Sequence, residues 1–171
     1  AASMERRRLP KTGMLRSAHM LGNEEEIIFA ATDLLADTKL APELSNEAHY
    51  YRAKAYLDAG KTDGAMEDLK VLAKDTRNVY GAEAKYKVAQ IYFDGGQTDK
   101  AEQEVLNYIE VSTPHTYWLA RSFVLLADVY MKLGRNLDAK QYLLSLKQNY
   151  QADDDIAGMI ESRLEKLKTE N

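Results

Sequence analysis

Histidine and carboxylate side chains carry most general acid–base chemistry and most metal sites, so their spacing bears most directly on catalysis. The three histidines, His19, His49 and His115, lie far apart, and none has a metal-ligating side chain four residues further on. The chain has no cysteine, which excludes a thiol nucleophile, a thiolate metal site and a disulfide framework. It also lacks the motifs of serine hydrolases, P-loop NTPases and dinucleotide-binding enzymes. We therefore expect no enzymatic activity, no cofactor and no bound metal.

Two runs of three acidic residues, Glu24–Glu26 and Asp153–Asp155, have two interpretations. Carboxylates so close together are candidate metal ligands or catalytic acids. They also suit the start of a helix, where a negative charge is stabilised by the helix dipole and an aspartate accepts a backbone hydrogen bond. The run lacks the combination of glycine and glutamate at the spacing of a calcium-binding loop. Helix capping is the favoured interpretation of both runs, and a metal site at Asp153–Asp155 is the alternative.

The charge balance and the apolar runs exclude two classes of partner. The chain has 171 residues, about the size of one domain, and a formal net charge of −4, which provides no strong attraction for nucleic acid. The one basic cluster is Arg6–Arg8 with Lys11 and Arg16. It is interpreted as a solvated stub rather than a nucleic-acid contact or localisation signal, because no basic stripe continues along the chain. No apolar run approaches the roughly 20 residues needed to cross a bilayer, so we expect no membrane insertion.

The elements that must position these residues are predicted by an internal repeat. Three copies of the pattern Ala-x2-Tyr-x3-Gly-x4-Ala begin at Ala53, Ala89 and Ala127, with offsets of 36 and 38 residues. In each copy a large apolar residue follows the second alanine by four positions, as Leu69, Val105 and Leu143. Projecting back 38 residues from the first copy locates a degenerate fourth copy, which keeps the glycine as Gly22. Agreement at this many positions indicates repeated structural units.

Each unit is predicted to be a pair of antiparallel helices. In the first full unit, the segment 44–59 has apolar residues at helical spacing, and Gly60 supplies the left-handed residue that ends a helix. Second helices are expected over 63–75, 99–111 and 137–150, with Thr62, Thr98 and Asn136 as their N-caps. One such hairpin cannot bury its apolar face alone, so the units must stack on one another. An amphipathic helix over 153–168 follows the last unit.

The pattern resembles the tetratricopeptide repeat (TPR). The resemblance implies an all-α fold, an α-α superhelix or TPR-like solenoid of antiparallel helix pairs, with a C-terminal capping helix. We expect one solenoid domain over residues 1–171, which is a fragment of a longer chain. Its expected parts are a degenerate repeat 8–41, repeats 42–77, 78–113 and 114–150, and the capping helix 153–168. The family's first-helix aromatic is replaced by His49 and Lys85 in two repeats and kept as Phe123 in the third.

A weaker resemblance concerns the cellular setting. The longer units, and the segment Tyr117–Arg121, resemble bacterial cell-envelope TPR proteins such as outer-membrane-assembly lipoproteins. This likeness implies a bacterial periplasmic or envelope location. The given chain itself carries no targeting signal.

The resemblance also implies the function, because the first helices of TPR proteins line a concave groove that binds partners. We expect a non-enzymatic protein–protein interaction scaffold that binds a peptide or protein in this groove. The implied groove residues are Tyr50, Lys54, Leu57, Asp58, Tyr86, Gln90, Phe93, Asp94, Arg121, Asp128, Met131 and Lys132. Their mixed charge and the absence of asparagine argue against the carboxylate clamp of chaperone-binding TPR proteins.

Two alternatives remain open for this groove. Tyr50 and Tyr86 occupy equivalent positions, so they are expected side by side as exposed binding residues, or else they pack between neighbouring helices. The alternative function is that of a structural segment of a longer TPR solenoid, acting in spacing or self-assembly through its ends. Homo-oligomerisation would then use an exposed apolar face near Met14, Ala18 and Phe29.

Overall fold

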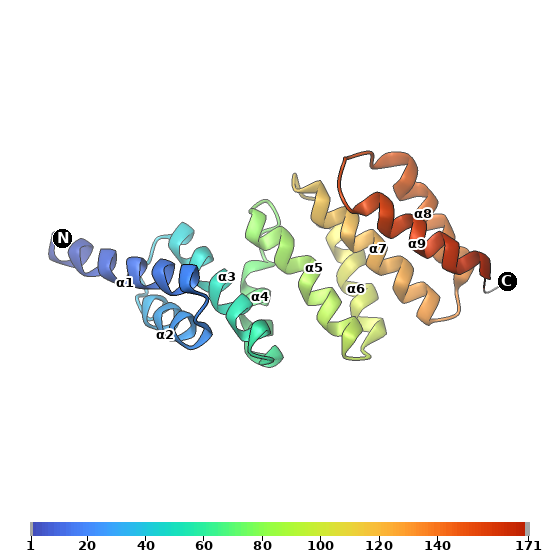
Figure 1. The fold of residues 1–171 in the computed structure, drawn as a ribbon. Helices are drawn as coiled ribbons and strands as arrows, with labels where there is room; N and C mark the ends of the chain where they lie inside the picture. Colours follow the sequence, from blue (N-terminus) through green and yellow to red (C-terminus); the bar gives the residue numbers. More distant parts are fainter. Residues whose placement is uncertain (1, 170–171) are drawn as a thin grey trace. The chain divides into compact units, whose positions relative to one another are not determined.

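The computed structural model describes residues 2–169, with side chains from Lys11 onward, and within these residues it contains nine α-helices and no β-strand (Figure 1). The helices are α1 (Ala2–Leu21), α2 (Glu24–Leu35), α3 (Pro42–Asp58), α4 (Thr62–Leu72), α5 (Val79–Asp94), α6 (Thr98–Val111), α7 (Thr116–Lys132), α8 (Asn136–Asn149) and α9 (Ile156–Thr169). The predicted all-α fold is confirmed. The side chains of the basic cluster Arg6–Arg8 lie outside the described residues. None of the helices in the described part is both long and apolar enough to span a bilayer.

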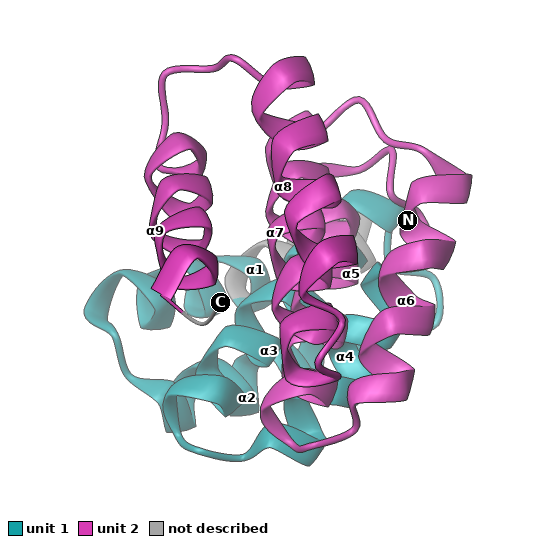
Figure 2. Ribbon diagram, turned by 90° about the vertical axis from the view of Figure 1, so that its right-hand side faces the viewer, with its two compact units in different colours: residues 1–74 teal, residues 75–171 magenta. Residues whose placement is uncertain are grey.

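The helices separate into two compact units, residues 1–74 and 75–171 (Figure 2). In the first unit α1 packs on α2, α2 on α3 and α3 on α4, and α1 also contacts α3. In the second unit α5 packs on α6 and α7, α7 packs on α8, and α9 contacts both α7 and α8. The C-terminal helix therefore covers the last helix pair. The single domain over 1–171 and its repeat boundaries stay predictions.

Each helix pair turns at a glycine in the left-handed backbone region. The φ angles lie between 68° and 78° at Gly22, Gly60, Gly96 and Gly134. At Gly60 the glycine amide donates to the carbonyl of Leu57 at 3.0 Å, and the amide of Lys61 donates to the carbonyl of Tyr56 at 2.7 Å. This is the Schellman pattern, and it satisfies two carbonyls that the helix end would leave unpaired. The predicted helix-ending role of the repeat glycine is confirmed.

The prediction of Thr62, Thr98 and Asn136 as N-caps is wrong. The caps are the preceding residues Lys61, Gln97 and Arg135, and none of them forms a side-chain capping bond. The reason is that the residue after the glycine has two roles. Its amide closes the first helix, while its carbonyl accepts the first hydrogen bond of the second helix. Only in the α1–α2 pair does this residue also cap with its side chain, since Asn23 accepts from the amide of Glu26 at 3.1 Å.

The small and large residues of the repeat pattern form the core. The six pattern alanines, Ala53, Ala65, Ala89, Ala101, Ala127 and Ala139, have no exposed surface. The large residues Leu69, Val105 and Leu143 are at most 2% exposed. Small side chains allow the two helices of a pair to approach closely, and the larger ones fill the remaining space. Burial of the pattern residues is therefore what holds each helix pair together.

The first-helix position at which the family pattern expects an aromatic residue contacts the second helix of its own pair in every repeat. The pairs join a first-helix residue to the second-helix residue 19 positions later, as His49 with Asp68, Lys85 with Glu104, and Phe123 with Tyr142. His49 Nδ1 lies 2.7 Å from Asp68 Oδ1, and Lys85 Nζ lies 2.7 Å from Glu104 Oε1. The first repeat thus uses a histidine–aspartate hydrogen bond, the second a lysine–glutamate ion pair and the third two aromatic rings.

The ion pair of the first unit is deeply buried. Asp68 is 1% exposed and also accepts two hydrogen bonds from the Arg52 guanidinium, at 2.7 and 2.9 Å. Burial by itself raises the pKa of the Asp68 carboxyl, but the hydrogen bonds from His49 and Arg52 outweigh it and hold the pKa below its usual range. Arg52 also donates to the Thr32 hydroxyl at 3.1 Å, so this network connects α2, α3 and α4.

The C-terminal helix begins later than predicted, at Ile156 instead of 153. The acidic run lies just before it. Asp154 accepts a hydrogen bond from the Ile156 amide at 2.9 Å, so its predicted capping role is confirmed. Asp155 instead accepts from the hydroxyl of Tyr117 on α7 at 2.9 Å. Asp154 therefore starts the helix, and Asp155 attaches it to its neighbour.

Candidate functional site

In the first unit, the predicted groove residues lie along one helix, α3. Tyr50 and Leu57 are half-buried, Lys54 is partly exposed and Asp58 is exposed. The Lys54 ammonium lies 5.3 Å from the centre of the Tyr50 ring, which is a favourable cation–π distance for residues one helical turn apart. Tyr50 thus remains partly accessible. Because Tyr86 belongs to the other unit, the expected adjacency of the two tyrosines stays a prediction.

In the second unit, Tyr86 is not the exposed residue that one interpretation expected. It is only 7% exposed, its ring centre lies 5.7 Å from that of Trp118, and its hydroxyl donates to Gln90 at 2.9 Å. Burial raises the pKa of the Tyr86 hydroxyl, and the nearby Arg121 guanidinium lowers it in part. The physical reason for the burial is Trp118, which reaches Tyr86 from the next first helix. The alternative interpretation, packing between neighbouring helices, describes this residue.

Arg121, another predicted groove residue, is held by the same aromatic cluster. Its guanidinium carbon lies 4.9 Å from the centre of the Tyr86 ring and 5.9 Å from that of Trp118. It also donates to the Tyr117 hydroxyl at 3.3 Å, which in turn donates to Asp155. Such stacking restrains an arginine side chain and uses much of its contact surface. Arg121 therefore stabilises the junction of α5, α7 and the segment before α9.

The structure does bring four predicted residues together, at the carboxyl ends of α5 and α7. They line a depression of about 660 Å³ with three residues of α9. We call it the α9 hollow, and its lining residues are Phe93, Asp128, Met131, Lys132, Ser162, Arg163 and Lys166. Gln90 and Asp94 lie on the same helix as Phe93, and Gln90 Nε2 donates to Asp94 at 2.8 Å. Apolar and cationic groups thus meet in one concave site.

The charges of the α9 hollow are partly neutralised. Arg163 donates to both oxygens of Asp128, at 2.8 and 2.9 Å, in the bidentate geometry that gives strong arginine–carboxylate pairs. Among the described side chains, no carboxylate pairs with Lys132 or Lys166. The hollow therefore combines the apolar surfaces of Phe93 and Met131 with two available ammonium groups. It is suited to an apolar side chain that has a negative charge beside it.

Sequence reasoning missed the contribution of α9 to this site. Ser162, Arg163 and Lys166 lie outside the repeats, in a helix that the sequence indicates only as a cap. A signal was present, since Arg163 and Lys166 are three residues apart and therefore share one helix face. Their approach to α7 nevertheless depends on how α9 docks. Elsewhere among the described residues, no group of three histidine, aspartate or glutamate side chains is placed to hold a metal ion.

The comparisons with known proteins agree with this architecture. Residues 47–75 and 120–148, which include most of the α3–α4 and α7–α8 pairs, match tetratricopeptide repeat family models. No curated protein sequence matches the chain.

Two solved structures are similar in fold. The nearly identical TPR-like repeats of a Podosopora anserina kinesin light chain-like protein have a TM-score of 0.58 and 15% identity, and the match covers 95% of this chain and 94% of that one. MamA has a TM-score of 0.61 and 21% identity, with coverage of 92% and 96%. Identity this low establishes the shared fold alone. Two segments of the chain thus match tetratricopeptide repeats in sequence, and its helix pairs have the fold of TPR-like repeat structures.

Proposed function

We propose that this chain is a non-enzymatic scaffold that binds a peptide or protein partner on the surface of its first helices. TPR repeats generally mediate protein–protein interaction, which supports the broad assignment. The observation that carries the finer proposal is the α9 hollow. It combines two apolar side chains with two ammonium groups that pair with no carboxylate among the described side chains, in a concave site formed by three helices.

The chemistry of the hollow favours a particular kind of partner segment. An apolar side chain buried against Phe93 and Met131 contributes about 1.5–3 kcal/mol. A carboxylate beside Lys132 or Lys166 adds at most about 1 kcal/mol, because both ammonium groups are exposed to solvent. The apolar contact would thus provide most of the binding free energy, and the charge would provide the preference for an acidic residue beside it. The proposed partner segment carries a large apolar residue next to an aspartate or glutamate.

An array of short synthetic peptides that vary the apolar and acidic positions independently tests this proposal. Peptides with both features are expected to bind best, and Lys132→Glu or Lys166→Glu is expected to remove the preference for acid. Lys140→Glu is the matched control, because Lys140 is an exposed lysine on α8 and does not line the hollow. Equal binding by all three variants, or binding that ignores the apolar position, would contradict the proposal.

A second candidate function is that of a structural segment of a longer solenoid, acting in spacing or self-assembly through its ends. It is supported by the exposed apolar side chains of the first helix pair, Met14 at 58% and Phe29 at 69%. Ala18, which was expected on this face, is buried at 3%. Light scattering over a range of concentrations measures self-association, and a strictly monomeric protein would argue against assembly through the ends.

A further inference from the structure

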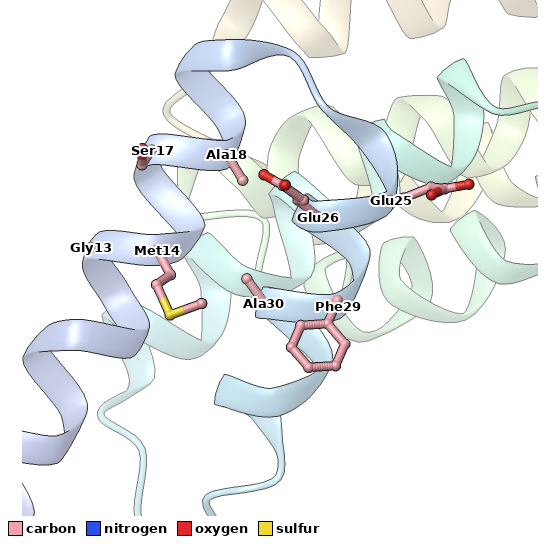
Figure 3. Close-up of a pocket in the computed structure, with 8 residues that line it drawn as sticks. All are labelled: Gly13, Met14, Ser17, Ala18, Glu25, Glu26, Phe29 and Ala30. Carbon is pink, nitrogen blue, oxygen red and sulfur yellow. The ribbon is translucent and has the colours of Figure 1, made fainter.

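The α1–α2 pair carries an apolar depression lined by residues of both helices. It is about 700 Å³ in volume and is formed by Gly13, Met14 and Ser17 of α1 with Glu25, Glu26 and Phe29 of α2. Figure 3 shows Met14 and Phe29 projecting to the same side of the helix pair, with both glutamates at the start of α2. We call this surface the outer face. Its two large apolar side chains are among the most exposed in the described residues.

The next helix pair indicates what kind of element covers such a face. The positions 38 residues after Gly13, Met14 and Ser17 are Tyr51, Arg52 and Ala55.

In the α3–α4 pair these three positions are covered by helices of the preceding pair. Tyr51 stacks on His19 of α1 with 4.0 Å between ring centres, and Arg52 donates to Thr32 of α2 at 3.1 Å. Ala55 is 2% exposed and shares a core cluster with residues of α1 and α2. The register of the repeat therefore makes the α1 half of the outer face, which includes Met14, a helix-packing surface that continues an interface already present in the first unit.

The charge of the outer face further restricts which residues can flank the apolar stripe of a partner helix. Glu25 and Glu26 line it, and among the side chains described from Lys11 onward no lysine or arginine does. A helix that buries an apolar stripe against Met14 and Phe29 would place its flanking residues beside these carboxylates. Flanking lysine or arginine would be attracted there, whereas flanking glutamate would be repelled.

We propose that the outer face is a docking surface for an amphipathic helix of a partner, with an apolar stripe flanked by lysine or arginine. This inference rests on the second candidate function, in which the ends of the helix array make contacts. A second copy docking through α9 does not offer the required stripe. The described residues of α9 bury their large apolar side chains against α7 and α8 and expose no large apolar residue.

A labelled synthetic peptide tests the docking surface directly. The probe is an amphipathic helix with a leucine–alanine stripe and flanking lysines, and its control has the same stripe with flanking glutamates. Fluorescence anisotropy is expected to show about tenfold tighter binding of the lysine peptide. Met14→Glu or Phe29→Glu is expected to weaken binding at least about tenfold, because each removes apolar contact from the centre of the face. The double variant Glu25→Lys, Glu26→Lys is expected to reverse the preference between the two peptides.

Control variants separate this proposal from its alternatives. Leu137→Glu changes a side chain that is 71% exposed in the second unit, and it should leave peptide binding unchanged. Circular dichroism verifies that each variant is folded. Equal binding of the two peptides, or full binding by Met14→Glu, would overturn the proposal. A concentration-dependent dimer that Met14→Glu abolishes would overturn it in favour of a second copy. A monomer that binds the lysine peptide would contradict self-assembly while supporting the docking surface.

Discussion

Two helix pairs are joined by polar side chains, His49 with Asp68 and Lys85 with Glu104. Replacing Asp68 with alanine tests whether the contribution of such a pair to stability increases with its burial. Asp68 is 1% exposed, and its removal leaves the Arg52 guanidinium and the His49 imidazole without their shared carboxylate. These two side chains are 19% and 16% exposed, so they regain little water. Breaking a buried pair by removing one partner costs about 3–5 kcal/mol. We expect about 3 kcal/mol, because Arg52 keeps its bond to Thr32.

The chain provides a matched control in Glu104, which occupies the equivalent position 36 residues later. Glu104 is 24% exposed, and its partner Lys85 keeps a hydrogen bond to Asn107 at 2.7 Å. Because Lys85 is only 11% exposed, Glu104→Ala is expected to cost about 1.5 kcal/mol, which is less than for Asp68→Ala because the removed carboxylate is partly solvated. Thermal unfolding followed by circular dichroism should show a fall of about 6–12 °C for Asp68→Ala and about 3–6 °C for Glu104→Ala. Equal shifts for the two variants would refute the reasoning from burial.

The effect of pH provides a second check on Asp68. Because the folded-state pKa of this carboxyl is lowered, its contribution to stability is fully present above the unfolded pKa of about 3.9. The contribution is lost as the pH falls through the lower, folded-state pKa. The stability difference between the original protein and Asp68→Ala should shrink as the pH falls below about 4. A difference that stays constant into acid would contradict the assigned charge pair.

The remaining predictions concern a turn, a helix contact and a buried phenol. Gly60→Ala should destabilise by about 1–2 kcal/mol in urea unfolding, because φ is 74° there, whereas Gly158→Ala inside α9 should stabilise by up to about 1 kcal/mol. Arg163→Ala should speed hydrogen exchange in α9 by a few-fold, since it removes a half-buried pair with Asp128 worth about 1 kcal/mol; unchanged exchange would exclude that pair as an anchor. Tyr108→Phe should cost about 1 kcal/mol through loss of its bond to a backbone carbonyl of α5. Burial raises the pKa of Tyr108 to about 12, so the stability of the folded protein should fall as the pH rises above about 10. Urea midpoints measured from pH 9 to 11 should show a smaller fall for Tyr108→Phe than for the original protein.

Much of the fold could be predicted because its signals are local. The glycine of each repeat marks a backbone conformation that other residues seldom adopt, so Gly60 and its equivalents located the turns directly. The alanine positions identified the buried helix faces in the same way. The N-caps were predicted one residue too late, because the preference of threonine for capping is weaker than the backbone hydrogen bonds of the Schellman turn.

The candidate site could be predicted only in part, because its geometry depends on contacts between distant residues. Phe93, Met131 and Lys132 were found from their places on the first helices. The burial of Tyr86 depends on Trp118, which lies 32 positions away, and periodicity within one helix carries no information about such a partner. Periodicity within one helix also does not predict that Arg163 of the terminal helix pairs with Asp128 of α7.

The kind of fold, the turn positions and the lack of the common catalytic motifs can all be recognised from the sequence. These features are set by residue types a few positions apart, and spacing along the chain therefore reveals them. The tertiary structure decided which first-helix residues remain accessible, because neighbouring helices bury Tyr86 and restrain Arg121. It also decided that α9 completes the hollow and that Met14 and Phe29 stay uncovered. Whether a side chain is accessible depends on the helices packed against it, and these contacts exist only in the folded structure.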